Sequence, residues 1–141
     1  MKLSPLDEYP IHQTPAPVSW PATSDRNFYD RSYFNVLDRG GRFMALTGIG
    51  YYPRLGVKDA YFVVRHGDTQ TAVHLSDAID DDRLNQHVNG YRLDVIEPLQ
   101  QIHLTLDETE GIAADLTWRG VFPAALERPH DMLTDRRVTL Q

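Results

Sequence analysis

The chain has 141 residues, of which 41% are hydrophobic and 24% charged, a composition that suits a globular domain with its own core and argues against disorder. Its formal net charge is −6, so it lacks the positive footprint that nucleic-acid binding requires. It has no cysteine, which excludes disulfides and cysteine-based metal centres.

Targeting signals are also missing from the sequence. The first residues lack the apolar core of a signal peptide. No stretch approaches the roughly 20 apolar residues that a membrane-spanning helix needs. The sequence therefore predicts a cytoplasmic protein with no membrane partner.

Residues 1–27 form the first region, which is rich in proline and shows no hydrophobic period. Proline at this density interrupts both helices and strand ladders. We predict an extended arm that lies on the domain, with Tyr9 and Trp20 as its anchors. The prolines of the arm are Pro5, Pro10, Pro15, Pro17 and Pro21.

Two β-hairpins are predicted next. Residues 27–37 alternate in polarity and are rich in aromatic side chains, and a glycine-containing turn joins them to a second strand at 42–51. The same signals predict a hairpin from 59–65 and 69–76. Alternation at this spacing is typical of strands with one buried face.

Three further turns divide the segment 84–119 into strands. Asn89-Gly90 is a strong two-residue hairpin signal, because both residues tolerate positive φ. Pro98 has the fixed φ of a turn residue, and a polar stretch at 107–111 ends in glycine. Each turn sets which residues face each other across the neighbouring strands.

Alignment by these turns pairs Leu93 with Leu104, and on the other side Leu104 with Ala114. Because side chains alternate between faces, the register predicts one apolar and one polar face. The predicted apolar face holds Leu93, Val95, Ile102, Leu104, Leu106, Ile112, Leu116 and Trp118. The predicted polar face holds His87, Arg92, Asp94, His103, Thr105, Asp115, Thr117 and Arg119.

Short strands with turn chemistry between them predict an all-β fold. We expect an antiparallel meander of about eight strands, arranged as a barrel or a sandwich, over residues 28–120. Residues 121–141 lose the alternating pattern and are predicted to be a polar C-terminal tail.

Four segments carry a family resemblance: 24–35, 48–53, 96–99 and 114–118. They resemble a bacterial family related to the AttH and hydroxyneurosporene synthase (CrtC-like carotenoid hydratase) proteins. The resemblance implies a lipocalin-like barrel or sandwich. In that superfamily two such domains usually lie in tandem, and relatives act on terpenoid or polyketide-like molecules.

The resemblance covers only the first of the two domains that this superfamily usually has. It therefore implies that residues 121–141 are the start of a missing second domain. The expected partner is a second copy, forming a homodimer, or a separate lipocalin-like domain. No hydratase residue lies in the matching segments, so none is transferred to this chain.

The best candidates for chemistry are Asp94, His103 and Asp115, which the register places on three neighbouring strands. A carboxylate that holds an imidazole is a common acid–base arrangement. The alternative is an ordinary polar outer face. His87 could join this row as a metal ligand, but no histidines have metal-ligand spacing, so we predict neither a metal nor a cofactor.

The aromatic segments predict a cavity for a small hydrophobic molecule, with core packing as the alternative. The predicted ligand-binding residues are Phe28, Tyr33, Tyr51, Tyr61, His87 and Arg92. Three functions follow from the sequence. The first is a binding domain for a hydrophobic ligand. The alternatives are a lyase, hydratase or isomerase that uses His103, and a structural half-domain that needs a partner.

Overall fold

The computed structural model describes residues 2–11, 16–126, 131–134 and 137–140. The predicted all-β fold is confirmed, since the chain forms two four-stranded antiparallel sheets. Within the described residues, helix is limited to two short 3-10 turns, Pro5–Glu8 and Pro53–Leu55. No described helix is both long enough and apolar enough to span a membrane.

The first sheet, sheet A, is a meander in the order β1-β2-β3-β4. Its strands are β1 (Asp30–Leu37), β2 (Phe43–Tyr52), β3 (Val57–His66) and β4 (Thr69–Ala78). The turns between them lie where the sequence predicts them. The first strand, however, begins at Asp30, three residues later than predicted.

The second sheet, sheet B, follows in the order β5-β6-β7-β8. Its strands are β5 (Gln86–Val88), β6 (Tyr91–Glu97), β7 (Gln101–Thr109) and β8 (Ile112–Arg119). The eight strands of the two sheets match the predicted meander. The predicted polar tail also contains β9 (Asp131–Thr134) and β10 (Arg137–Leu140), which pair with each other.

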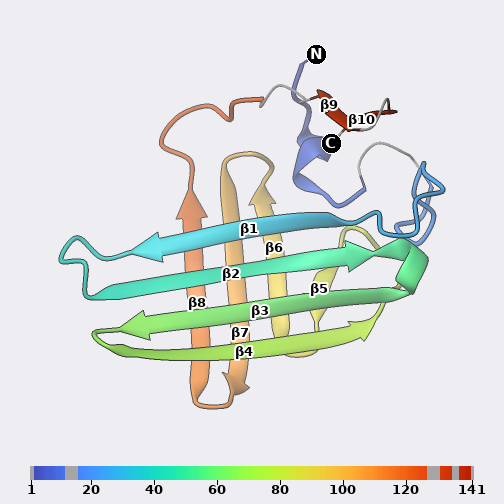
Figure 1. Ribbon diagram of the computed structural model, residues 1–141. Helices are drawn as coiled ribbons and strands as arrows, with labels where there is room; N and C mark the ends of the chain where they lie inside the picture. The colour runs from blue at the N-terminus through green and yellow to red at the C-terminus, as the bar shows by residue number, and fades with distance from the viewer. Residues whose placement is uncertain (1, 12–15, 127–130, 135–136, 141) are drawn as a thin grey trace.

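The two sheets form two layers whose strands cross, with sheet A in front of sheet B in Figure 1. Each sheet is hydrogen-bonded separately, so of the two predicted alternatives the chain adopts a sandwich. The core lies between the layers, and both sheets contribute to it. Its sheet residues are Ala45, Ile49, Tyr51, Ala60, Phe62, Val73, Val88, Tyr91, Leu93, Ile102, Leu104, Leu106 and Ile112.

The predicted register of sheet B is correct on one side of β7 and wrong on the other. Leu93 pairs with Leu104 as predicted. Leu104 then pairs with Leu116 rather than with Ala114. The turn lies later than expected, at Glu110-Gly111, where both residues have positive φ, and β7 carries an irregularity after Leu106. Because the error is two residues, both predicted faces keep their side chains.

The N-terminal arm lies on the domain, but Trp20, one of its two predicted anchors, does not hold it there, while Tyr9, the other, is half-buried. Trp20 is 69% exposed, whereas Ile11 and Val18 are fully buried in the core. The backbone N–H of Ile11 donates to the carboxylate of Asp30 at 2.5 Å. Arg83 donates to the Ile11 carbonyl at 3.3 Å. Two small aliphatic side chains therefore anchor the arm, and the indole lies outside.

Two glycines of β2, Gly48 and Gly50, lie on the outer surface of sheet A next to aromatic rings. A Cβ added at Gly48 would lie 3.1 Å from the ring of Tyr61, and one at Gly50 would lie 3.2 Å from the ring of Tyr52. The ring of Tyr61 covers Gly48 from the neighbouring strand β3, whereas Tyr52 is two residues beyond Gly50 on β2 itself, so only the first pair is cross-strand. This is the stabilising use of an aromatic side chain opposite a strand glycine.

Candidate functional site

The predicted acid–base residues share the outer face of sheet B. Asp94 pairs directly with His103 across β6 and β7, while Asp115 of β8 pairs with the neighbouring Thr105. His103 Nε2 nevertheless lies 2.8 Å from Asp115 Oδ1. Asp94 lies 3.4 Å from Arg92 instead. The structure therefore brings the three residues to one face but joins only two of them.

This face is open to solvent. The side chain of Asp115 is 81% exposed and that of His103 is 32% exposed. His103 lines neither of two clefts that lie among the described residues, one at the start of β8 and one beside the arm. An exposed histidine–carboxylate pair contributes little binding energy, because water competes for both partners. The pair can exchange protons with solvent, and its Asp115, unlike His103, also lines the larger of these clefts.

The predicted aromatic ligand residues do not gather around one cavity. Tyr33 is 56% exposed and, like Tyr61, lies on the outer face of sheet A. Tyr51 is buried in the core, and Phe28 packs against its edge. None of these four residues lines either cleft.

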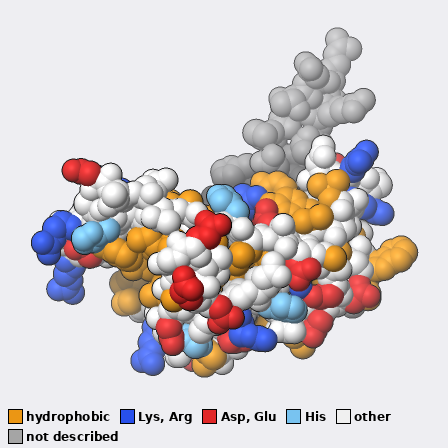
Figure 2. Space-filling view, turned by 90° about the horizontal axis from the view of Figure 1, so that it is seen from below, with side chains coloured by type: hydrophobic (Ala, Val, Ile, Leu, Met, Phe, Trp, Pro, Cys, Tyr) orange, Lys and Arg blue, Asp and Glu red, His pale blue; other side chains and the backbone are white. Residues whose placement is uncertain are grey.

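The larger cleft lies elsewhere, between the two sheets at the end of the sandwich where β8 begins. Its volume is about 510 Å³. Sheet A contributes one wall and the start of β8 contributes the other. The lining residues are Phe43, Phe62, Val64, Thr71, Gly111, Ile112, Ala113, Ala114, Asp115 and Leu116. Figure 2 shows hydrophobic side chains set back in a hollow on the left of the view, between groups of charged side chains.

The walls of the cleft follow from strand alternation. Phe62 and Val64 are two residues apart on β3, so both point toward sheet B. Thr71 lies opposite Val64 and adds one hydroxyl to this wall. On β8, Ala114 and Leu116 point inward, whereas Ala113, Asp115 and Thr117 point outward. The small side chain of Ala114 leaves space that a larger residue would fill.

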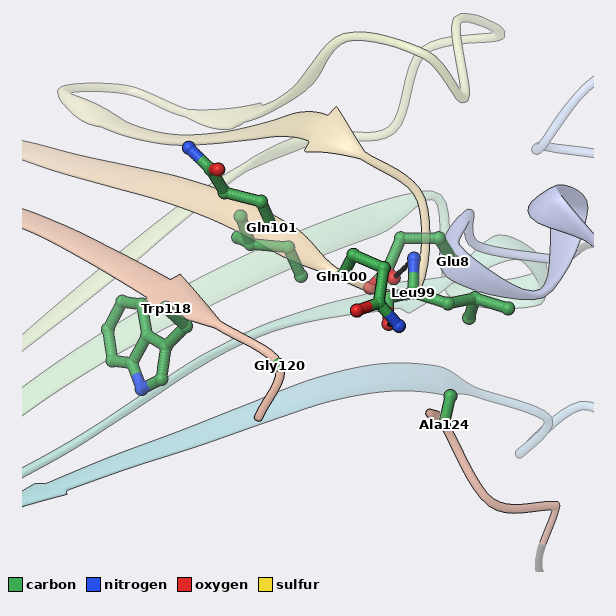
Figure 3. A pocket seen from close by; sticks show the side chains of 8 residues that line it. Glu8, Leu99, Gln100, Gln101, Trp118, Gly120 and Ala124 are labelled. Carbon is green, nitrogen blue, oxygen red and sulfur yellow. Dashed lines mark hydrogen bonds between the residues drawn. The ribbon is translucent and has the colours of Figure 1, made fainter. Parts of the chain in front are cut away.

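The smaller cleft has a volume of about 220 Å³ and lies where the arm meets the turn after β6. Figure 3 shows Glu8 reaching the backbone of Leu99, whose N–H donates to Glu8 Oε2 at 2.5 Å. Leu99 has a positive φ of 63°, an uncommon conformation for a leucine, and this bond helps to hold it. The contact fixes the arm to the turn, and the cleft is smaller than most ligand sites.

A buried ion pair lies at the end of sheet A that the arm covers. Lys58 Nζ lies 2.5 Å from Asp80 Oδ2, with the lysine side chain 2% exposed and the carboxylate 40% exposed. Burial alone would raise the pKa of Asp80. The hydrogen bond from Lys58 and the N–H of Asp82 outweigh that effect and lower this pKa. Water therefore reaches this ion pair mainly from the side of the carboxylate.

Two neutral polar side chains are buried at the same end of the sandwich. Tyr51 pairs with Lys58 across β2 and β3, and Gln86 begins β5, which contacts β2, β3 and β4. Within the described part of the chain, the Tyr51 hydroxyl and both amide atoms of Gln86 have no hydrogen-bond partner. Burial, followed by the charge of Asp80, raises the pKa of Tyr51.

We call these four residues (Lys58, Asp80, Tyr51 and Gln86) the inner polar cluster. Tyr51 was predicted as a ligand-binding residue, whereas the other three were missing from the predicted site residues. Alternation along β3 could have predicted that Lys58 is buried, since it shares the inward face with Ala60 and Phe62. Among the described residues, no group of three or more histidine, aspartate or glutamate side chains is arranged to hold a metal ion.

Comparison with known proteins identifies a family but no activity. Searches of the curated proteins and of the solved structures give no match. One family matches residues 3–141, which is nearly the whole chain, and it is described as a family of unknown function (DUF8625). The chain therefore belongs to the DUF8625 family of unknown function.

Proposed function

We propose that this domain binds a small hydrophobic molecule in the larger cleft between its two sheets. The observation that carries the proposal is the cleft itself, with a volume of about 510 Å³ and walls formed by inward-facing apolar side chains of both sheets. Ligand sites typically measure about 300–1,000 Å³ and have mostly apolar walls with few polar groups. The cleft fits that description.

The chemistry of the walls favours a ligand with few polar groups. Phe43, Phe62, Val64, Ile112 and Leu116 offer only carbon atoms to a bound molecule. Burial of apolar area contributes about 25 cal/mol per Å², so a ligand with some 200 Å² of apolar surface would gain about 5 kcal/mol before its entropic costs. Because about 4.1 kcal/mol corresponds to a dissociation constant of 1 mM, such a ligand would bind in the millimolar range, with a limit of roughly 0.2 mM.

One hydroxyl can orient the ligand. Thr71 is the lining residue of sheet A that has a polar side-chain atom. A ligand with a single hydroxyl or carbonyl group could accept or donate one hydrogen bond there. A terpenoid or polyketide-like molecule, the ligand class implied by the resemblance to the AttH and hydroxyneurosporene synthase proteins, has this combination of a carbon skeleton and few oxygen atoms.

The test uses the neutral fluorescent probe N-phenyl-1-naphthylamine, with farnesol as the competitor. We expect saturable probe fluorescence in the wild-type protein and its displacement by farnesol. Ala114→Trp should fill the cleft and reduce the probe affinity at least tenfold. The matched control is Thr117→Trp, which adds the same indole on the outward face of β8 and should leave binding unchanged.

Circular dichroism and thermal melting establish that both variants are folded. If Ala114→Trp does not fold, Ala114→Leu makes a smaller change at the same position and should lower the affinity by a smaller factor. Equal probe affinity in the wild-type protein and in a folded Ala114 variant would refute the proposal, as would the absence of saturable binding.

A further inference from the structure

We propose that the outer face of sheet A binds a second copy of this chain and forms a two-fold symmetric dimer. The inference goes beyond ligand binding and does not depend on it. In Figure 1 this face is turned toward the viewer, and no other described segment crosses it. Its outward side chains are fixed by the register of the four strands.

The centre of this face is apolar. Its apolar outward residues are Tyr33 and Leu37 on β1, Met44 and Leu46 on β2, Tyr61 and Val63 on β3, and Ala72 on β4, and the same face also carries the polar residues Asn35 and His74. Tyr33 is 56% exposed and Leu37 is 66% exposed. Tyrosine, methionine and arginine are enriched at the centres of protein interfaces. The outer face of sheet B differs sharply, since it carries Arg92, Asp94, His103, Asp115 and Arg119.

The size and shape of the face also suit a protein partner. Strands spaced about 4.8 Å apart and about eight residues long, at about 3.3 Å per residue, make a four-stranded plate of roughly 500 Å² before side-chain relief is counted. A standard interface buries about 800 Å² of accessible surface per partner. Gly48 and Gly50 carry no side chains of their own, and the rings of Tyr61 and Tyr52 lie beside them on this face.

Charge selects a second copy as the partner. On β3 the outward residues run Asp59, Tyr61, Val63 and Arg65, so opposite charges lie at equal distances from Phe62. Consider a two-fold axis that lies in the interface plane, perpendicular to the strands, and passes over Phe62. This axis places β3 of one subunit antiparallel to β3 of the partner subunit. Asp59 then faces Arg65 of the partner subunit, and Tyr61 faces Val63 of the partner subunit.

The neighbouring strands obey the same symmetry. Thr47 pairs with Phe62, so the axis also passes over Thr47 of β2. Leu46 then faces Gly48 of the partner subunit, which carries no side chain of its own. Besides Asp59 and Arg65, this face carries Arg31 of β1. Its guanidinium donates to the hydroxyl of Tyr52 at 2.6 Å within its own subunit. The symmetric arrangement therefore leaves no charged group facing its like.

The experiment measures molar mass by light scattering and sedimentation over a concentration series. We expect a dimer for the wild-type chain. The single charge reversals Asp59→Arg and Arg65→Asp should each shift the protein toward monomer by at least tenfold in dissociation constant. The double reversal, Asp59→Arg with Arg65→Asp, exchanges the charges and should restore the dimer.

Asp115→Arg is the control, because it reverses a charge on the outer face of sheet B and should leave the dimer intact. Thermal melting establishes that each variant is folded. A wild-type chain that stays monomeric at high concentration would overturn the inference. So would single reversals that leave the dimer unchanged, or a folded double reversal that stays monomeric.

Discussion

The two polar groups of this sandwich occupy opposite environments. The row of Asp94 and His103 with Asp115 lies on the outer face of sheet B, where water reaches every member. The inner polar cluster lies between the sheets, with the ammonium of Lys58 almost fully buried. Strand alternation places the strand residues of both groups, whereas Asp80 reaches Lys58 from the loop between β4 and β5.

This comparison shows that the contribution of a polar residue to stability depends less on its position in the strand than on whether another layer covers its sheet face. Water solvates the outer row, so its hydrogen bonds replace bonds to water at little net gain. In the inner polar cluster, bulk water cannot replace a lost partner of the buried Lys58 ammonium. Substitutions in the two groups should therefore differ greatly in their effect on stability.

The largest expected effect comes from Asp80→Ala. This change leaves the Lys58 ammonium buried without its partner, which should lower the free energy of unfolding by about 3–5 kcal/mol. Lys58→Met removes the buried charge instead and leaves a carboxylate that is partly solvated, so it should cost about 1 kcal/mol or less. Urea unfolding measures both. If Lys58→Met lowers the stability more than Asp80→Ala does, the interpretation that burial of the Lys58 charge is the costly part of this ion pair is wrong.

Acid should weaken the same ion pair. The folded pKa of Asp80 is lowered below the unfolded value of about 3.9. The stability that this shift contributes is therefore fully present above the unfolded pKa and is lost as pH falls through the folded pKa. The difference in unfolding free energy between the wild type and Asp80→Ala should be constant from about pH 8 to pH 5 and shrink below about pH 4. A difference that already shrinks near pH 6 would point to another titrating group.

Two buried tyrosines should respond oppositely to loss of the hydroxyl. Tyr51→Phe removes a buried hydroxyl that has no partner among the described residues, so stability should stay unchanged or rise by about 1 kcal/mol. The matched control is Tyr91→Phe, because Tyr91 Oη lies 3.1 Å from Thr47 Oγ1. Loss of that bond should cost about 1 kcal/mol. An equal loss in both variants would show that Tyr51 has a partner in solution, such as an ordered water.

The smallest expected effect is that of His103→Ala on the outer row. The His103–Asp115 pair is exposed, and exposed pairs contribute about 0–1 kcal/mol. We expect a change in unfolding free energy of about 0.5 kcal/mol or less, and no change in the affinity for N-phenyl-1-naphthylamine. A loss of probe binding would revive the hypothesis that His103 belongs to a functional site.

Local chemistry explains which parts of the fold could be predicted from the sequence. Asn89-Gly90 and Pro98 set the position of their turns, and the pairing of Leu93 with Leu104 follows from them. The pairing of Leu104 with Ala114 was wrong, because β7 continues past the predicted turn position. The strand also contains an irregularity that the local sequence pattern does not predict. The predicted apolar face remained correct, since a shift of two residues restores the alternation.

The candidate sites were harder to predict, because they depend on how the two sheets cross. Phe43 of β2 and Leu116 of β8 line the same cleft, yet nothing in either strand specifies that they meet. The anchors of the arm show the same limitation. Trp20 is the larger apolar residue, but Ile11 and Val18 occupy the core because the path of the backbone brings them there.

The attachment of the arm has a consequence for the order of folding. Glu8 bonds to Leu99 and Ile11 bonds to Arg83, so the arm's partners lie 91 and 72 residues further along the chain. During synthesis these partners emerge from the ribosome long after the arm itself. Contacts between distant residues form late, because closing a long loop costs entropy before any bond forms. The first segment to be made should thus be among the last to be placed, and it must stay soluble in the meantime, which five prolines favour by blocking strand pairing.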